Sequence, residues 1–199
     1  MKAIQIVDLS GPETALREAD LPEPEPSHML TPGSGVLVDV KAAGVSFPEV
    51  LQTRGEYQMK PPLPFVPGSE VAGVVRSAPA GSPLSPGDRV AAFPMLGGFA
   101  EVAVAPEFLT FPLPDDLDFR QGAALILNYH TAWFALVLRG RLAAGETVLV
   151  HGAAGGVGTS AIELGKHFGA KVIAAASTDE KLALCKQLGA DEVINYSTT

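Results

Sequence analysis

The sequence of 199 residues lacks several features on which common protein classes depend. Its only cysteine is Cys185, which excludes an intrachain disulfide, and four histidines add few donors for a tetrahedral zinc site. Lys and Arg number 14 against 22 Asp and Glu, a balance that argues against nucleic acid as a main partner. No apolar run reaches the length of a membrane span, and the first residues do not form a signal peptide. We therefore expect a cytoplasmic protein that binds neither membranes nor nucleic acid.

What the sequence does contain is a candidate phosphate-binding turn. An apolar, β-branched strand at Thr147–His151 passes into small residues and then into a helix at Val157–Gly169. Small residues let the backbone approach a pyrophosphate, whose charge is stabilised by the amides and dipole of the helix N-terminus. Such a hexapeptide alone is weak evidence for a nucleotide site, because a flexible turn can have the same sequence. The order of strand, turn, helix and strand nevertheless favours a dinucleotide site. The turn residues expected to bind the cofactor are Ala153, Ala154, Gly155, Gly156, Val157 and Gly158.

The residues after this turn predict the first half of a doubly wound α/β sheet. Gly169 is expected to end the helix in a left-handed conformation. The run Lys171–Ala176 is typical of a parallel strand buried on both faces, and Glu192–Tyr196 of a third strand. The complete fold has six strands, of which this chain can supply about three. The apolar stripe expected on the helix consists of Val157, Ala161, Leu164 and Phe168.

The end of the second strand distinguishes between the two nicotinamide cofactors. An NAD site has an Asp or Glu about twenty residues past the glycines to bind the ribose 2′-hydroxyl. This chain has Ser177 there, followed by Lys181 and by Tyr196 at the end of the third strand. A hydroxyl, a cation and a phenol suit a 2′-phosphate, so the sequence favours NADP(H), although Lys181 is also consistent with a solvated helix lysine. Asp179 and Glu180 are interpreted as charges in the first turn of a helix rather than as ribose ligands.

The first two-thirds of the chain are typical of a β domain with many turns. Ser46 can cap a short helix, and Glu49 three residues later completes a capping box. Regular short strands separated by glycine and proline predict a small barrel, and a helical stretch at Phe119–Arg139 leads to the nucleotide unit. Strands are expected at Lys2–Leu9, Val36–Ala43, Val71–Ser77, Arg89–Phe93 and Ala100–Val104.

Segments spread over nearly the whole chain carry a family resemblance. They are Val40–Ser46, Gly55–Tyr57, Pro61–Val75, Gly87–Val90, Gly97–Glu101, Thr131–Ala132, the glycine turn and Lys186–Tyr196. Their order resembles that of the zinc-independent medium-chain dehydrogenases/reductases, in the quinone oxidoreductase branch. The resemblance implies a mixed fold, with a GroES-like β-barrel domain over residues 1–122 followed by the first half of a Rossmann domain over residues 123–199. It also implies NADP(H) as cofactor and an active site in the cleft between the two domains.

The resemblance separates the chain from metal-dependent relatives. Those relatives carry a cysteine where this chain has Ser46, a histidine where it has Ser69, and a further cysteine near Leu127. We therefore expect no metal site and no metal-assisted alcohol oxidation. His130 and His151 flank the bridge helix and the phosphate turn, and are expected to be packed or capping residues rather than ligands or bases.

The implied reaction is the transfer of a hydride from NADPH to a quinone without a metal. Reduction of a quinone or an activated C=C bond develops negative charge on a conjugated oxygen, which a hydroxyl, an amide or a water can stabilise. By resemblance, Ser46 stands where many relatives have an asparagine, Tyr57 matches a tyrosine that lines the substrate cleft, and Thr131 matches a threonine near the nicotinamide. Asn128 adds an amide. The alternative for Ser46, Thr131 and Asn128 is a role at the start of a helix, and for Tyr57 that of a loop anchor.

Two other functions remain open from the sequence. One is the same chemistry on an enone or an enoyl thioester, and the other is a cofactor-binding or structural protein with little activity, as lens crystallins of this family illustrate. The family's remaining Rossmann strands and the segment that returns to the barrel have no counterpart after Thr199, so we expect a fragment that binds its cofactor weakly. Full-length members are usually homo-oligomers.

Overall fold

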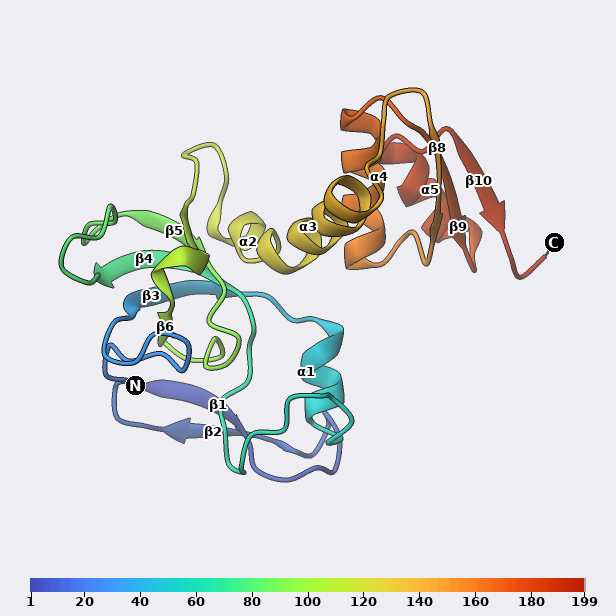
Figure 1. Cartoon of the computed structure of the whole chain (residues 1–199). Helices are drawn as coiled ribbons and strands as arrows, with labels where there is room; N and C mark the ends of the chain where they lie inside the picture. The colour runs from blue at the N-terminus through green and yellow to red at the C-terminus, as the bar shows by residue number, and fades with distance from the viewer. Residues whose placement is uncertain (199) are drawn as a thin grey trace. The chain divides into compact units, whose positions relative to one another are not determined.

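The structure is a computed structural model that describes residues 1–198 in two compact units. The first unit spans Met1–Leu127 and the second Asn128–Thr199. The first is built of antiparallel strands with short helices, whereas the second alternates parallel strands with helices (Figure 1). The predicted fold class, a small β domain followed by the first part of a Rossmann domain, is confirmed.

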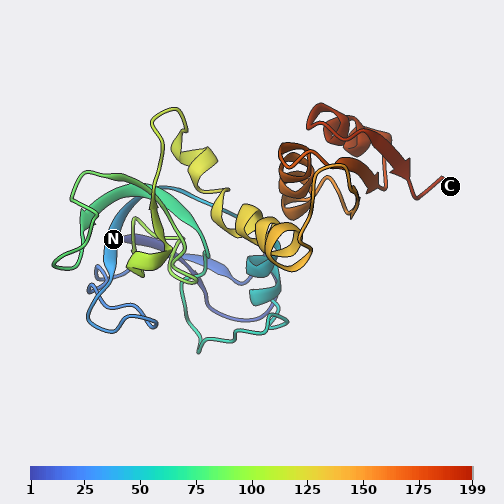
Figure 2. The same cartoon turned by 45° about the horizontal axis from the view of Figure 1, so that its top comes forward.

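The first unit contains a five-stranded and a two-stranded sheet. The five-stranded sheet has the order β6-β3-β4-β5-β7 and curls around its own core, as Figure 2 shows. The pair β1-β2 is connected to the rest by bridges between Ala3 and Ala100 and between Ile6 and Phe65. The strands are β1 (Lys2–Ile6), β2 (Leu16–Asp20), β3 (Val36–Ala43), β4 (Val71–Ser77), β5 (Arg89–Ala92), β6 (Val102–Ala105) and β7 (Thr110–Pro112); the helices are α1 (Phe47–Gln52), η1 (Glu107–Leu109) and α2 (Phe119–Gly122).

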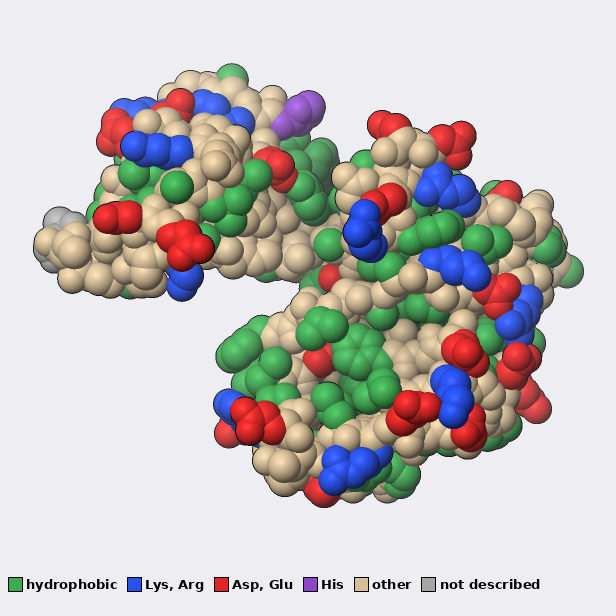
Figure 3. Space-filling view, turned by 180° about the vertical axis from the view of Figure 1, so that it is seen from behind, with side chains coloured by type: hydrophobic (Ala, Val, Ile, Leu, Met, Phe, Trp, Pro, Cys, Tyr) green, Lys and Arg blue, Asp and Glu red, His purple; other side chains and the backbone are tan. Residues whose placement is uncertain are grey.

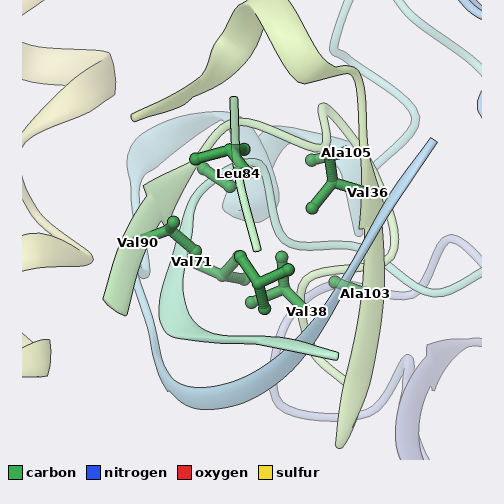
Figure 4. Close-up of a cluster of buried hydrophobic side chains, with 9 residues drawn as sticks. Val36, Val38, Val71, Leu84, Val90, Ala103 and Ala105 are labelled. Carbon is green, nitrogen blue, oxygen red and sulfur yellow. The ribbon is translucent and has the colours of Figure 1, made fainter. Parts of the chain in front are cut away.

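Small apolar side chains, mostly valine and alanine, fill the inside of the curled sheet. Alternate residues point inward at Val36 and Val38 of β3 and at Ala103 and Ala105 of β6, as the two-residue period of a strand requires. Position 73 on β4 requires a glycine, because a Cβ there would lie 2.1 Å from the carbonyl oxygen of Asp39 on the neighbouring strand. The side chains that meet in this core include Val36, Val38, Val71, Leu84, Val90, Ala103 and Ala105 (Figure 4).

The second unit has a parallel sheet of the order β10-β9-β8. The strand β9 pairs with β8 on one side and with β10 on the other, so the strand–turn–helix–strand order predicted from the sequence is confirmed. Gly169 has a φ of +76°, as expected of the residue that ends α4. The elements are α3 (Ile126–Trp133), which begins in the last residues of the first unit, η2 (Phe134–Arg139, a π-helix), β8 (Thr147–His151), α4 (Gly156–His167), β9 (Lys171–Ala176), α5 (Asp179–Gln187) and β10 (Glu192–Asn195).

Several sequence predictions differ from the structure in detail. The first strand ends at Ile6 rather than Leu9, because Asp8 and Ser10 form a side-chain turn there. The strands β2 and β7 were not predicted, and β6 lies slightly later than expected. The helical stretch 119–139 is broken into α2, α3 and a π-helix.

The face that α4 buries also differs from the prediction. Val157 is 42% exposed, whereas the buried residues of the helix are Gly158, Ser160, Ala161, Ile162 and Gly165. Gly165 lets the helix approach the sheet closely, because a Cβ there would lie 2.9 Å from the Val172 side chain. Among residues 1–198, none of the helices combines the length and the apolarity needed to cross a bilayer.

Candidate functional site

The turn between β8 and α4 has the backbone geometry of an anion cradle. Gly152 takes a left-handed φ of +58°, and the Gly155 N–H donates to the Gly152 carbonyl at 2.9 Å. Gly155 then caps α4 in an extended conformation, and it has no side chain that could accept from the first N–H groups of the helix. Those amides and the helix dipole therefore remain available to an anion.

The glycines of this turn serve two different purposes. A Cβ on Gly158 would lie 2.6 Å from the Gly152 carbonyl oxygen and 2.7 Å from Ala153 backbone atoms, so the close packing of the turn requires a glycine there. A Cβ on Gly155 would meet only the Gly152 carbonyl oxygen, at 3.3 Å, and would otherwise project into open space. That open space beside the backbone fits the pyrophosphate of a dinucleotide.

Three predicted cofactor residues come together at the carboxyl ends of β9 and β10. The Lys181 ammonium donates to the Ser177 hydroxyl at 3.3 Å. The Tyr196 N–H donates to the Ala176 carbonyl at 3.2 Å, which fixes the backbone of Tyr196 beside Ser177, while its side chain stays largely exposed. Asp179 lies in the first turn of α5, where it accepts from the Asn195 amide at 2.8 Å. The carboxyl ends of these strands thus offer a hydroxyl and a cation beside the backbone of Tyr196, and Asp179 is already hydrogen-bonded.

The helix α3 carries Asn128 and Thr131. The Asn128 carboxamide lies against the phosphate turn, since a Cβ on Gly156 would be 2.7 Å from its oxygen. Thr131 is exposed on the same helix. Between them, the Tyr129 hydroxyl donates to the Glu163 carboxylate and thereby joins α3 to α4. Burial, followed by this carboxylate, raises the pKa of Tyr129 to about 12, so it remains a donor at physiological pH.

Ser46 and Ser69 of the first unit are joined by a buried carboxylate. Glu49, 4% exposed, accepts from the Ser46 N–H at 2.9 Å, from the Ser69 N–H at 3.0 Å and from the Ser69 hydroxyl. The predicted capping role of Glu49 toward Ser46 is confirmed. Tyr57 lies half-buried in the loop that follows α1. The connection from Glu49 to Ser69 was not predicted, because the two residues are 20 positions apart.

A second buried carboxylate, Glu70, was missed by sequence reasoning. Its side chain is 2% exposed, and its Oε2 accepts from the Leu127 N–H at 2.9 Å. Burial raises the pKa of Glu70; the amides of Leu127 and Ile126 oppose this shift, and the charge of Glu49 reinforces it. The only sequence signal was an acid directly before an apolar strand, which does not reveal a partner 57 residues away.

Two of the histidines lie on the surface, which carries charges of both signs. His130 and His151 are exposed, so of the two expected roles, packed or capping, the capping role stays a prediction. Within the described part of the chain, no three or more His, Cys, Asp or Glu side chains are grouped to hold a metal ion. On the face that Figure 3 shows, Lys and Arg side chains are interspersed with Asp and Glu.

The raised pKa of Glu70 predicts a pH-dependent stability. Because folding raises this pKa above the ordinary value of 4.5, the folded state holds the proton more tightly than the unfolded state. The contribution to the free energy of unfolding is complete at low pH and is lost as pH rises through the folded-state pKa. The test measures the free energy of unfolding with urea at pH 5 and at pH 8. Between these two pH values it is expected to decrease less for Glu70→Gln than for the wild type. Equal decreases in both proteins, with the exposed Glu25→Gln as control, would contradict this prediction.

Comparisons with protein families match both parts of the chain. Residues 32–115 match the family described as "Alcohol dehydrogenase GroES-like domain". Residues 156–199 match the family described as "Zinc-binding dehydrogenase". The two matches fall in the first and the second unit, respectively.

Individual relatives match nearly the whole chain. The quinone oxidoreductase of Rattus norvegicus is 44% identical over 98% of this chain, and the chain spans 59% of that protein's length. A probable oxidoreductase from Mycobacterium abscessus is 52% identical over 97% of this chain and 60% of its own, with a TM-score of 0.87. The quinone oxidoreductase of Thermus thermophilus, solved also in complex with NADPH, is 39% identical over 97% of this chain and 59% of its own, with a TM-score of 0.83.

Proposed function

Because the chain belongs to the medium-chain dehydrogenase/reductase family, in its quinone oxidoreductase branch, we propose that the protein transfers a hydride from NADPH to a quinone. The chain spans about 59% of the length of the curated relative it matches in Rattus norvegicus. The observation that carries the proposal is the convergence of Ser177, Lys181 and Tyr196 beside an open glycine turn.

The preference for NADPH rests on charge and on hydrogen-bond donors. A 2′-phosphate needs cations and donors, which Lys181 and the two hydroxyl groups supply, whereas an unmodified ribose is usually bound by an acid at the strand tip. Solved quinone oxidoreductases of Thermus thermophilus and Escherichia coli were determined with NADPH, and both are similar to this chain over its length. The uncapped amides at the start of α4 suit the pyrophosphate of the same molecule.

On the acceptor side, we infer that hydroxyl groups stabilise the developing charge. NADPH, when bound, supplies the hydride. Ser46, half-buried at the start of α1, and Tyr57 are the candidate donors of the first unit, and Thr131 is that of α3. Asn128 is better suited to the cofactor than to the acceptor, because its carboxamide lies against Gly156 of the phosphate turn.

The proposal is tested by NADPH oxidation with different acceptors. We expect the purified protein to reduce 1,4-quinones with NADPH, and to do so equally well after treatment with a metal chelator. Short enones and enoyl thioesters serve as competing acceptors, and NADH serves as the cofactor control. Faster turnover of an enoyl thioester than of any quinone would replace the proposed acceptor. Binding of NADPH without turnover of any acceptor would instead support a structural, crystallin-like role.

A further inference from the structure

The buried carboxyl group of Glu70 lies at the start of the helix that carries Asn128 and Thr131. Its Oε2 accepts from the Leu127 N–H at 2.9 Å, and the Ile126 N–H also interacts with the carboxylate. Both amides belong to the first turn of α3, where backbone N–H groups have no acceptor within their own helix. Glu70, 57 residues earlier in the chain than Leu127, therefore caps this helix from a distance.

The other side of Glu70 contacts the segment that leads to Ser46. The Gly44 N–H donates to the Glu70 carbonyl oxygen at 3.0 Å. The contact is so close that a Cβ on Gly44 would lie 2.6 Å from the Glu70 Cγ and 2.4 Å from the Ala123 carbonyl oxygen. Two residues after Gly44, Ser46 caps α1 and is bonded to Glu49. Glu70 thus lies between the start of α3 and the backbone that precedes Ser46.

The surroundings of Glu70 exclude a direct part in proton transfer. The groups that donate to its carboxylate are backbone amides, which do not relay protons, and the residue is only 2% exposed. The titratable group that acts on it is Glu49, itself held by Ser46 and Ser69. The hydrogen bonds of Glu70 and Glu49 can instead hold the segments that they connect at fixed distances from one another.

We propose that Glu70 is a positioning residue, which holds the first turn of α3 against the Gly44–Ser46 segment so that Ser46, a proposed donor of the hydride-transfer site, keeps its position. This inference rests on the proposed function. The two buried carboxylates, Glu49 and Glu70, together join segments 44–49, 69–70 and 126–127 by hydrogen bonds. Ser46, Ser69 and Leu127, where zinc-dependent relatives have metal ligands, lie in these three segments.

The test compares Glu70→Ala with Glu70→Gln, which keeps an acceptor oxygen of the same reach. In Glu70→Ala we expect kcat for quinone reduction to fall about 10-fold while the KM for NADPH changes less than about 3-fold, since a small misplacement affects the reaction more than cofactor binding. Hydrogen exchange of the Leu127 amide should become about 10-fold faster as its acceptor is lost. Glu70→Gln should stay within about 3-fold of the wild type in each measurement, as should the exposed Glu25→Gln.

Each outcome decides a separate point. Equal losses in kcat and in the fraction of folded protein would overturn the positioning role in favour of a structural one. An unchanged Leu127 exchange rate in Glu70→Ala would overturn the anchoring itself, whether or not the protein is active. Absence of turnover in the wild type would overturn the proposed function, and the exchange measurement would still test the anchor. If Glu70→Ala does not fold, Glu70→Asp, whose carboxyl group is retracted by one methylene, gives the same readouts.

Discussion

Replacing Lys181 with glutamate is expected to weaken NADPH binding about 100-fold and to change NADH binding less than about 3-fold. Lys181 lies at the carboxyl end of the parallel sheet, where its ammonium is bonded to the Ser177 hydroxyl at 3.3 Å. In the wild type, a 2′-phosphate bound there accepts a charge-assisted hydrogen bond from Lys181. In Lys181→Glu the carboxylate repels the phosphate instead. NADH has no phosphate at this position and should be almost indifferent. Fluorescence titration with the two nucleotides measures both affinities directly.

Lys186 provides the control for this substitution. It is exposed in the last turn of the same helix, α5, so Lys186→Glu changes the net charge by the same amount away from the strand tip. Only a local effect distinguishes the two variants, because long-range attraction of a polyanion is altered equally in both. Equal weakening of NADPH binding by both substitutions, or equal weakening of NADPH and NADH by Lys181→Glu, would contradict the assignment of a 2′-phosphate site.

The parts of the fold that were predicted correctly are those with local signals. The strand β9 and the glycine turn follow from a buried apolar run that ends in small residues, and both lie where expected. The strand β2 was missed because its sequence, Leu16–Asp20, is charged and mostly exposed. It exists because it pairs with β1, from Ile6 opposite Leu16 to Lys2 opposite Asp20, and such a partner is not visible in the sequence of the strand itself.

The candidate sites divide in the same way. The meeting of Ser177 and Tyr196 could be predicted, since the carboxyl ends of neighbouring parallel strands lie at one edge of a sheet. The bond from Ser69 to Glu49 and the role of Glu70 could not, because these carboxylates accept from backbone amides that lie far away in the chain. A carboxyl group surrounded by amides is recognised only when the tertiary structure brings those amides together.

Two glycine substitutions in the phosphate turn are expected to separate cofactor binding from stability. Gly155→Ala should weaken NADPH binding about 100-fold, because the methyl group would occupy the space beside the backbone that a pyrophosphate needs. Its own conformation, with φ of −82°, is open to alanine, so the free energy of unfolding should change by less than about 1 kcal/mol. Isothermal titration with NADPH and urea unfolding give the two quantities.

Gly158→Ala should act through the fold instead. Its Cβ would lie 2.6 Å from the Gly152 carbonyl oxygen, and because backbone cannot rotate away as a side chain can, the turn itself must shift. We expect a loss of about 1–3 kcal/mol in the free energy of unfolding, together with weaker NADPH binding. Gly156→Ala is the matched control, since the three atoms nearest to its Cβ all belong to the end of the Asn128 side chain, which can rotate. Stability that falls with Gly155→Ala but not with Gly158→Ala would mean that the two glycines have the opposite roles, with packing at Gly155 and phosphate approach at Gly158.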